Sequence, residues 1–146
     1  MGDAVVSSDG VAIGTRTEGD GPPLLLVHGW LGSHRTWAHL TPRWREHRRV
    51  LAVDLRGHGA SSAPHSGYAL PDLAGDLAAL LDVEGLRGAV VVAHSLGCSV
   101  TSWLAVQRQV VARAAKVDVV RVGAPLDRVA HHVDPEPLCR RQIGHV

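Results

Sequence analysis

The stretch that most constrains the fold is Val90-Val91-Val92-Ala93-His94-Ser95-Leu96-Gly97. Three consecutive β-branched residues predict a buried strand, and the residues after Gly97 show the apolar spacing of a helix. A sharp strand-to-helix turn of this kind, called a nucleophile elbow, lifts one side chain above the carboxyl edge of a sheet, and here that side chain is Ser95. The backbones of the strand and the helix pass close to each other at this turn, so small residues are needed two positions before and two positions after the serine. Gly97 fits the usual pattern, and Ala93 departs from it by one methyl group.

The rest of the chain alternates predicted strands with predicted helices. Residues 4–7 and 11–17 flank Asp9-Gly10, which is a strong signal for a short hairpin. Continuous apolar runs then predict buried strands at 24–27, 50–53 and 89–93, and the valine-rich segment 117–122 predicts another strand. Helical spacing appears at 34–46, broken by Pro42, at 71–82, and from the elbow to about 115. This order predicts an α/β fold: a mostly parallel sheet with flanking helices after an antiparallel N-terminal hairpin.

Composition restricts the possible partners and the cellular location. The 146 residues fit a single domain, 1–146, with a real core. A net charge of +1 does not favour a nucleic-acid partner, and no apolar run approaches the roughly 18–20 residues of a membrane span. The N-terminus shows no secretory signal, and Cys98 and Cys139 do not form a disulfide framework. We therefore expect a cytoplasmic protein with free thiols.

Three motifs stand in order, each at the carboxyl end of a predicted strand. They are His28-Gly29-Trp30, Asp54-Leu55-Arg56-Gly57-His58-Gly59-Ala60-Ser61 and Ala93-His94-Ser95-Leu96-Gly97. Together they resemble the α/β-hydrolase fold family, over residues 4–110 and with family-like character to about residue 115. The fold expected from the resemblance is a partial α/β-hydrolase fold.

The resemblance implies roles for several residues. Ser95 would be the nucleophile, and the backbone N–H groups of Trp30 and Leu96 would bind the oxyanion of a tetrahedral intermediate. The implied reaction is hydrolysis of an ester or similar acyl bond of a small-molecule substrate through an acyl-Ser95 intermediate, without a cofactor. A serine at this place argues against the dehalogenase and epoxide-hydrolase branches, which attack with a carboxylate. The esterase, haloperoxidase-like and carbon–carbon-bond hydrolase branches stay open.

Other polar residues are expected to be structural. The resemblance makes His28, His58 and His94 loop and turn residues, and none of them is the expected catalytic base. It also places residues 56–59 in a turn at the mouth of the pocket, and Asp54 ends a strand. His131 and His132 with Asp134 suggest a metal site, but adjacent histidines in an irregular segment are more often solvent-exposed, so no metal is expected.

The family's triad order is Ser…Asp/Glu…His, and residues 116–146 leave three interpretations of the acid and the base. In the favoured one, 117–125 is the strand directly after the elbow helix, and the chain is a truncated, inactive hydrolase. In the second, a lid and one strand are lost, Asp127 is the acid and His145 is the base. In the third, residues after about 107 are a non-homologous tail. A non-enzymatic binding module is the alternative function, and an exposed sheet edge predicts a possible homodimer.

Overall fold

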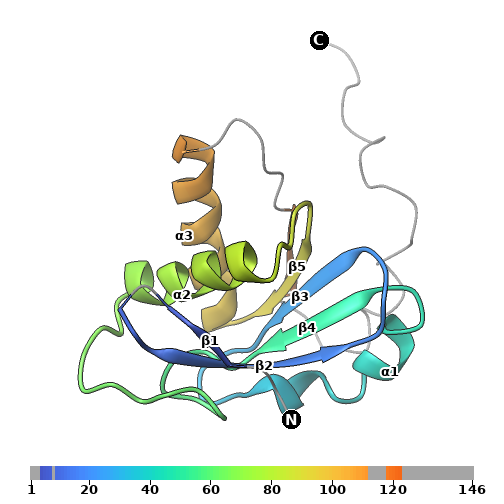
Figure 1. The fold of residues 1–146 in the computed structure, drawn as a ribbon, viewed down its shortest axis with the longest axis horizontal. Helices are drawn as coiled ribbons and strands as arrows, with labels where there is room; N and C mark the ends of the chain where they lie inside the picture. The colour runs from blue at the N-terminus through green and yellow to red at the C-terminus, as the bar shows by residue number, and fades with distance from the viewer. Residues whose placement is uncertain (1–3, 8, 112–117, 123–146) are drawn as a thin grey trace.

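The structure is a computed structural model that describes residues 4–7, 9–111 and 118–122 (Figure 1). Its strands form one six-stranded sheet in the order β1-β2-β4-β3-β5-β6. The strands are β1 (Ala4–Val6), β2 (Ala12–Glu18), β3 (Pro23–Val27), β4 (Arg49–Val53), β5 (Val90–His94) and β6 (Asp118–Val122). The pairings of β2 with β1 and β4 are antiparallel, and β4, β3, β5 and β6 run parallel. The predicted α/β fold with a mostly parallel sheet and an N-terminal hairpin is therefore confirmed.

The helices also follow the sequence pattern. The segment predicted as a broken helix contains the short 3₁₀ helix η1 (His34–Trp37) and α1 (Thr41–Trp44), with Pro42 in the first turn of α1. The two long helices are α2 (Leu70–Val83) and α3 (Leu96–Val111). The prediction that α3 continues to about residue 115 extends into 112–117, which lie outside the described residues.

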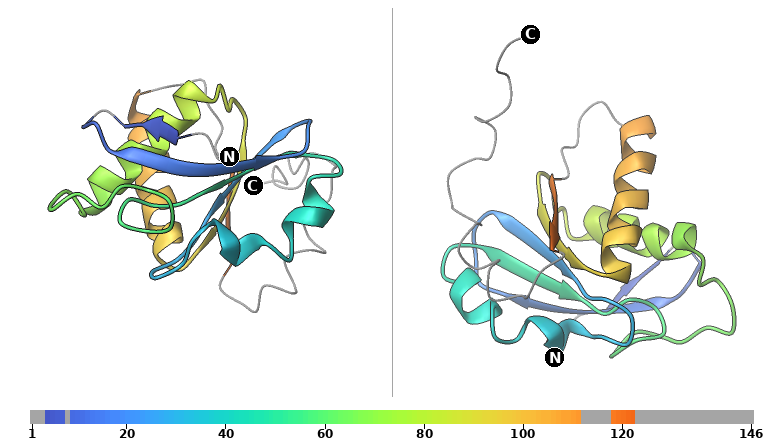
Figure 2. Two further views of the ribbon diagram at one scale, coloured as in Figure 1. Left: turned by 60° about the horizontal axis from the view of Figure 1, so that its bottom comes forward. Right: turned by 180° about the vertical axis from the view of Figure 1, so that it is seen from behind.

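Helices cover both faces of the sheet (Figures 1 and 2). On one face, α2 and α3 bury their apolar sides against Leu25, Val27, Leu51, Val53 and Val91. On the other face, Trp37, Leu40 and Trp44 of the broken-helix segment pack on Leu24, Leu26, Val50 and Val92. Because side chains alternate between faces along a strand, burial on both sides requires continuous apolar runs, which is what the sequence of β3 and β4 shows.

The register of the central strands brings the three motifs to one edge of the sheet. Val27 at the end of β3 pairs with Val53 of β4 and with Ala93 of β5. His28, Asp54 and His94 therefore stand next to each other at the carboxyl edge, although the chain separates them widely. Neighbouring strands lie about 4.8 Å apart, so the motifs lie within about 10 Å of one another.

Candidate active site

Ser95 occupies the sharp turn between β5 and α3. Its φ is +51°, and among the described residues only one other non-glycine residue, Leu31 with φ +58°, has a positive value. A left-handed conformation is uncommon for residues with a Cβ, and such strain persists where the surrounding structure enforces it, often at functional sites. The serine side chain is exposed beyond the end of β5, as the elbow pattern predicts.

Gly97 allows the first turn of α3 to lie against the end of β3. A Cβ on this residue would stand 2.6 Å from the carbonyl oxygens of both Val27 and His28. On the other side of the elbow, Ala93 is fully buried in β5 and keeps its regular pairing with Val27, so its extra methyl group fits.

The loop after β3 passes directly over the elbow. A Cβ on Gly29 would lie 2.9 Å from Ser95 Cβ and 2.8 Å from His94 Nδ1. The N–H of Gly32 donates to the carbonyl of Gly29 at 3.0 Å and closes a tight turn. Trp30 and Leu31 occupy that turn with side chains 67% and 82% exposed. The backbone that carries Trp30 is thus held next to the nucleophile.

Leu96, the second residue expected to bind the oxyanion, is the first residue of α3. The first N–H groups of a helix have no partner within it, and the positive end of the helix dipole favours negative charge there. One turn of the helix is closed by the N–H of Cys98, which donates to the carbonyl of Ser95 at 2.8 Å. In the structure, Leu96 thus follows Ser95 at the start of α3, and Gly29, the residue before Trp30, lies against Ser95.

Both ring nitrogens of His28 hydrogen-bond to backbone groups of the loops at this edge of the sheet. Its ring is fully buried, Nδ1 lies 2.7 Å from the carbonyl oxygen of Gly29, and Nε2 accepts from the N–H of Leu55 at 3.0 Å. These partners require the neutral tautomer with the proton on Nδ1. Burial lowers the pKa of His28, which favours the neutral ring. Both ring nitrogens are occupied by backbone groups, in agreement with the expected loop role.

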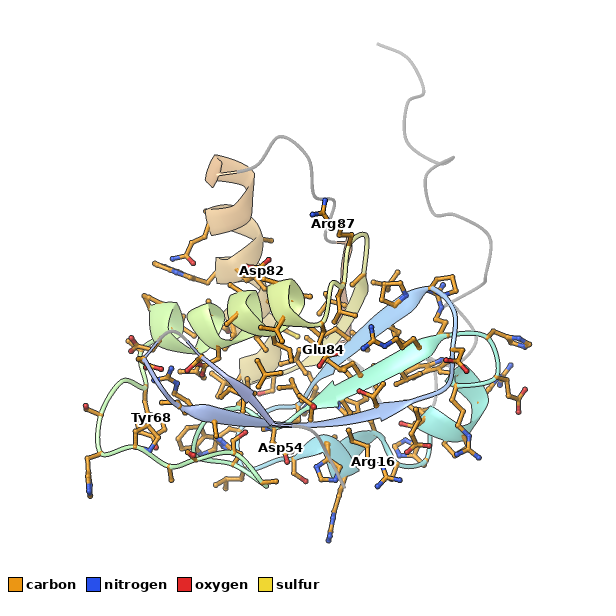
Figure 3. All side chains as sticks on the ribbon, viewed as in Figure 1. Arg16, Asp54, Tyr68, Asp82, Glu84 and Arg87 are labelled. Atoms are coloured by element: carbon orange, nitrogen blue, oxygen red, sulfur yellow. The ribbon has the colours of Figure 1, made fainter. Side chains whose placement is uncertain are left out.

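Asp54 organises the neighbouring turn. One carboxylate oxygen accepts from the N–H of His34 at 2.5 Å, and the other from the N–H of Ala60 at 2.9 Å and lies 2.9 Å from Nδ1 of His34. Burial acts to raise the pKa of Asp54, but the hydrogen bonds from Ala60 and His34 outweigh it, and the pKa is lowered. Asp54, labelled in Figure 3, is thus structural, as its position suggested. His34 was not identified from the sequence.

Arg56 lies in the turn that the resemblance makes mainly structural. Its side chain is only 2% exposed and makes two 2.6 Å hydrogen bonds to Asp76 of α2. It also donates to the carbonyl of Gly67 at 2.8 Å, and Asp9 lies 2.9 Å away. The carboxylate of Asp76 raises the pKa of Arg56. Arg56 therefore connects the loop between β4 and α2 to helix α2 and to the N-terminal hairpin, and the carboxylates of Asp76 and Asp9 neutralise its charge.

Tyr68 closes the same loop. A Cβ on Gly57, whose φ is +76°, would stand 2.8 Å from Cε1 of Tyr68, so the ring lies over this glycine. Figure 3 labels Tyr68 on the loop that leads into α2. Of residues 56–59, His58 is the one whose ring contacts Trp30, so it is His58 rather than Arg56 that reaches the site.

Several predicted residues lie outside the described part of the chain. They are Asp127 and His145, the suggested acid and base, and His131, His132 and Asp134. Among the described residues, no imidazole or carboxylate hydrogen-bonds to the hydroxyl of Ser95, and no group of three His, Cys, Asp or Glu residues could hold a metal ion. Within the same residues, no helix has the length and apolar character needed to span a membrane.

Known proteins resemble this chain in sequence and structure. A non-heme chloroperoxidase from Streptomyces lividans is 41% identical over 96 residues, 64% of this chain and 35% of that protein. A soluble epoxide hydrolase from Corynebacterium sp. (strain C12) is 35% identical over 105 residues, 71% of this chain and 37% of that protein. An esterase from Exiguobacterium antarcticum superposes with a TM-score of 0.79 at 25% identity, covering 85% of this chain and 46% of that one. The chain spans less than half the length of these relatives.

The family comparison covers most of the chain. The family model described as alpha/beta hydrolase fold matches residues 22–130, which include all three motifs. The match continues past residue 107, which favours the first two interpretations of residues 116–146 over a non-homologous tail beginning there. From the motifs, the strand order and this match we conclude that the chain belongs to the α/β-hydrolase fold family.

Proposed function

We propose that the chain carries the nucleophile and the oxyanion-binding groups of a serine hydrolase that cleaves an ester or similar acyl bond of a small molecule. The observation that carries the proposal is the strained, exposed Ser95 with the backbone of Gly29 packed against it. A strained serine at a strand-to-helix turn exposes its hydroxyl to a substrate carbonyl, and the adjacent loop offers backbone N–H groups on the other side.

In the first half of the reaction, a base removes the hydroxyl proton of Ser95 while Oγ bonds to the carbonyl carbon. The carbonyl π electrons move to oxygen, and the N–H groups of Trp30 and Leu96 donate to the resulting oxyanion. Each such donor contributes on the order of 10²–10³ in rate, because it is held in place before charge develops. Collapse of the intermediate breaks the bond to the leaving alcohol, which takes the proton from the base and leaves acyl-Ser95.

In the second half, water attacks the acyl carbon and gives its proton to the same base. The second tetrahedral intermediate uses the same donors. Its collapse breaks the bond between the acyl carbon and Oγ, which takes the proton back from the base, so the carboxylic acid is released and the hydroxyl of Ser95 is restored. The proposed base is His145 with Asp127 as its acid, which follow Ser95 in the order required for the family.

The relatives support hydrolytic chemistry but do not select one reaction. They carry names as different as chloroperoxidase, epoxide hydrolase and esterase. Residue 95 is a serine, and a hydroxyl forms an acyl ester where a carboxylate would form an alkyl ester. This residue favours acyl transfer for this chain, despite the 35% identity to an epoxide hydrolase.

A second candidate is a non-catalytic binding module of the same fold, favoured by the observation that no imidazole or carboxylate of the described residues hydrogen-bonds to the hydroxyl of Ser95. Without an imidazole partner, Ser95 stays about as unreactive as a free alcohol. Oxyanion binding alone gives a residual acceleration of about 10³–10⁴ over water in serine proteases that lack their triad.

Labelling with a fluorophosphonate probe separates the two candidates. We expect the wild-type chain to be labelled, Ser95→Ala to lose the label, and Ser99→Ala, which removes an exposed serine one turn further along α3, to keep it. Loss of labelling in His145→Ala as well would identify the base. A wild-type chain that is folded by circular dichroism but takes no label would contradict the hydrolase proposal for this chain and favour the binding module.

A further inference from the structure

The half-buried ring of His58 lies between two loops of the site. Its Nε2 accepts a hydrogen bond from the N–H of Leu31 at 3.3 Å, and its Nδ1 lies 3.0 Å from the carbonyl oxygen of Arg56. A backbone N–H has only a proton to offer and a carbonyl only a lone pair. The two contacts together therefore select one neutral tautomer, with the proton on Nδ1 and the lone pair on Nε2.

The same ring supports the neighbouring tryptophan. The rings of His58 and Trp30 meet edge to face, with centroids 5.6 Å apart and an interplanar angle of 75°. Aromatic pairs in this arrangement contribute about 0.5–1.5 kcal/mol beyond simple burial. Because the indole of Trp30 is largely exposed, this contact and the backbone on either side of it determine where residue 30 lies.

Two histidines hold the two sides of the Trp30 peptide. His28 bonds to the carbonyl of Gly29, on one side, and His58 accepts from the N–H of Leu31, on the other. The two rings contact each other with centroids 5.1 Å apart. Leu31 is one of the two described non-glycine residues with a positive φ, and such a backbone conformation persists only when its surroundings hold it. His58 provides part of that hold.

We propose that His58 is a positioning residue that fixes the N–H of Trp30 for the oxyanion through its acceptor bond from Leu31 and its ring contact with Trp30. This inference rests on the proposed function, since it assigns Trp30 as an oxyanion donor. Nothing in the geometry requires His58 to touch the substrate. Its effect belongs to the transition state, because a donor displaced from the developing charge loses most of its stabilising energy while substrate binding is little changed.

Two substitutions separate the acceptor from the ring. His58→Phe keeps an aromatic edge for Trp30 and removes the acceptor, whereas His58→Gln places an amide oxygen near the position of Nε2 and removes the ring. With p-nitrophenyl acetate as substrate, we expect His58→Phe to lower kcat by about 10²-fold with little change in KM, the usual consequence of a misplaced catalytic group. His58→Gln should recover most of that loss. The matched control is His65→Phe, which changes an exposed histidine of the same loop. This variant should keep wild-type kcat and KM.

A spectroscopic measurement tests the geometry without using activity. Nitrogen-15 spectra of the wild-type imidazoles should show His58 neutral with its proton on Nδ1, the less common form in water. The amide proton of Leu31 should shift and exchange faster in His58→Phe but not in His58→Gln. This measurement works even if Ser95 proves unreactive, so failure of the hydrolase proposal and failure of the His58 proposal remain distinguishable.

Any of three results would overturn the role of His58. The first is a His58 ring with its proton on Nε2, and the second is a Leu31 amide that is unchanged in His58→Phe. The third is an equal loss of kcat in the Phe and Gln variants together with a rise in KM, which indicates a general structural defect. Should His58→Phe fail to fold by circular dichroism, the tautomer of the wild-type ring and the kinetics of His58→Gln still decide the question.

Discussion

Gly29 and Gly97 each make a close contact at the elbow that a side chain would block, and each does so for a different reason. Gly29 leaves room for Ser95 and His94, so the loop before Trp30 lies directly on the elbow. Gly97 leaves room for two carbonyl oxygens at the end of β3, so α3 begins where the strand ends. Both glycines belong to the sequence motifs of this edge of the sheet, and the structure supplies the steric reason for each.

We expect Gly97→Ala to destabilise the protein. Its new methyl group would meet two backbone oxygens at 2.6 Å, and backbone cannot move aside as a flexible side chain does. Overpacking of this kind costs about 1–3 kcal/mol, and we expect the upper part of that range. The measurement is the free energy of unfolding in urea.

The matched control is Gly75→Ala in α2. A Cβ there meets no atom within 4 Å, so the change should stabilise the helix by about 0.5–1 kcal/mol. An unchanged unfolding free energy in Gly97→Ala, against a gain in Gly75→Ala, would show that the elbow adapts more easily than its geometry indicates.

At the scale of elements, the loop between β4 and α2 is held by a buried ion pair. Arg56 and Asp76 are almost completely buried and share two hydrogen bonds, while Asp9 and the carbonyl of Gly67 complete the arginine's partners. The pair connects the hairpin, the loop and α2. The placement of His58 beside Trp30 therefore depends on where this arginine anchors its turn.

Removing one member of that pair should be costly. We expect Arg56→Met to lower the free energy of unfolding by about 3–5 kcal/mol, because the carboxylate of Asp76 is left buried without its partner. The double variant Arg56→Met with Asp76→Leu should be less destabilised than Arg56→Met alone. Urea unfolding of the wild type, the two single variants Arg56→Met and Asp76→Leu, and the double variant measures this coupling. Additive losses in the double variant would show that water or another residue compensates the lone carboxylate.

At the scale of the whole molecule, acid should act through two buried groups. The pKa of His28 is lowered from 6.5, chiefly by burial, so as pH falls below 6.5 the unfolded chain takes up a proton that the folded ring refuses. In this range the unfolded state binds more protons than the folded state, so the free energy of unfolding decreases as the pH is lowered. Asp54, whose pKa is lowered from 3.8, adds a further loss as pH falls below 3.8 toward its folded value.

Thermal unfolding between pH 7.5 and 5.5 checks the histidine part. The Tm of the wild type should fall over this range, and the difference in Tm between the wild type and His28→Asn should narrow as pH decreases. The Asn variant can still donate to the carbonyl of Gly29 but has no ring to titrate. If Tm falls with decreasing pH by the same amount in the two proteins, the loss of stability in acid comes from other histidines.

Beyond the single chain, β1 and β6 are the end strands of the described sheet. Parallel pairing places β6 beside β5, with Val92 opposite Val120. An open strand edge offers unpaired backbone groups to another chain. Association of two copies through such an edge stays a prediction, as does the assignment of Asp127 and His145.

The sequence alone determined the elements and the elbow, and tertiary structure decided the side-chain connections between them. Periodicity and turn residues are local, so Val90–His94, the helix that follows and the helix broken at Pro42 were predictable. The bonds of His34 to Asp54, His58 to Leu31 and Arg56 to Asp76 join residues 20 to 27 positions apart. Such pairs form only after strand register and loop packing have brought their backbones together. A local sequence pattern spans only a few residues and therefore cannot predict which of these distant side chains will meet.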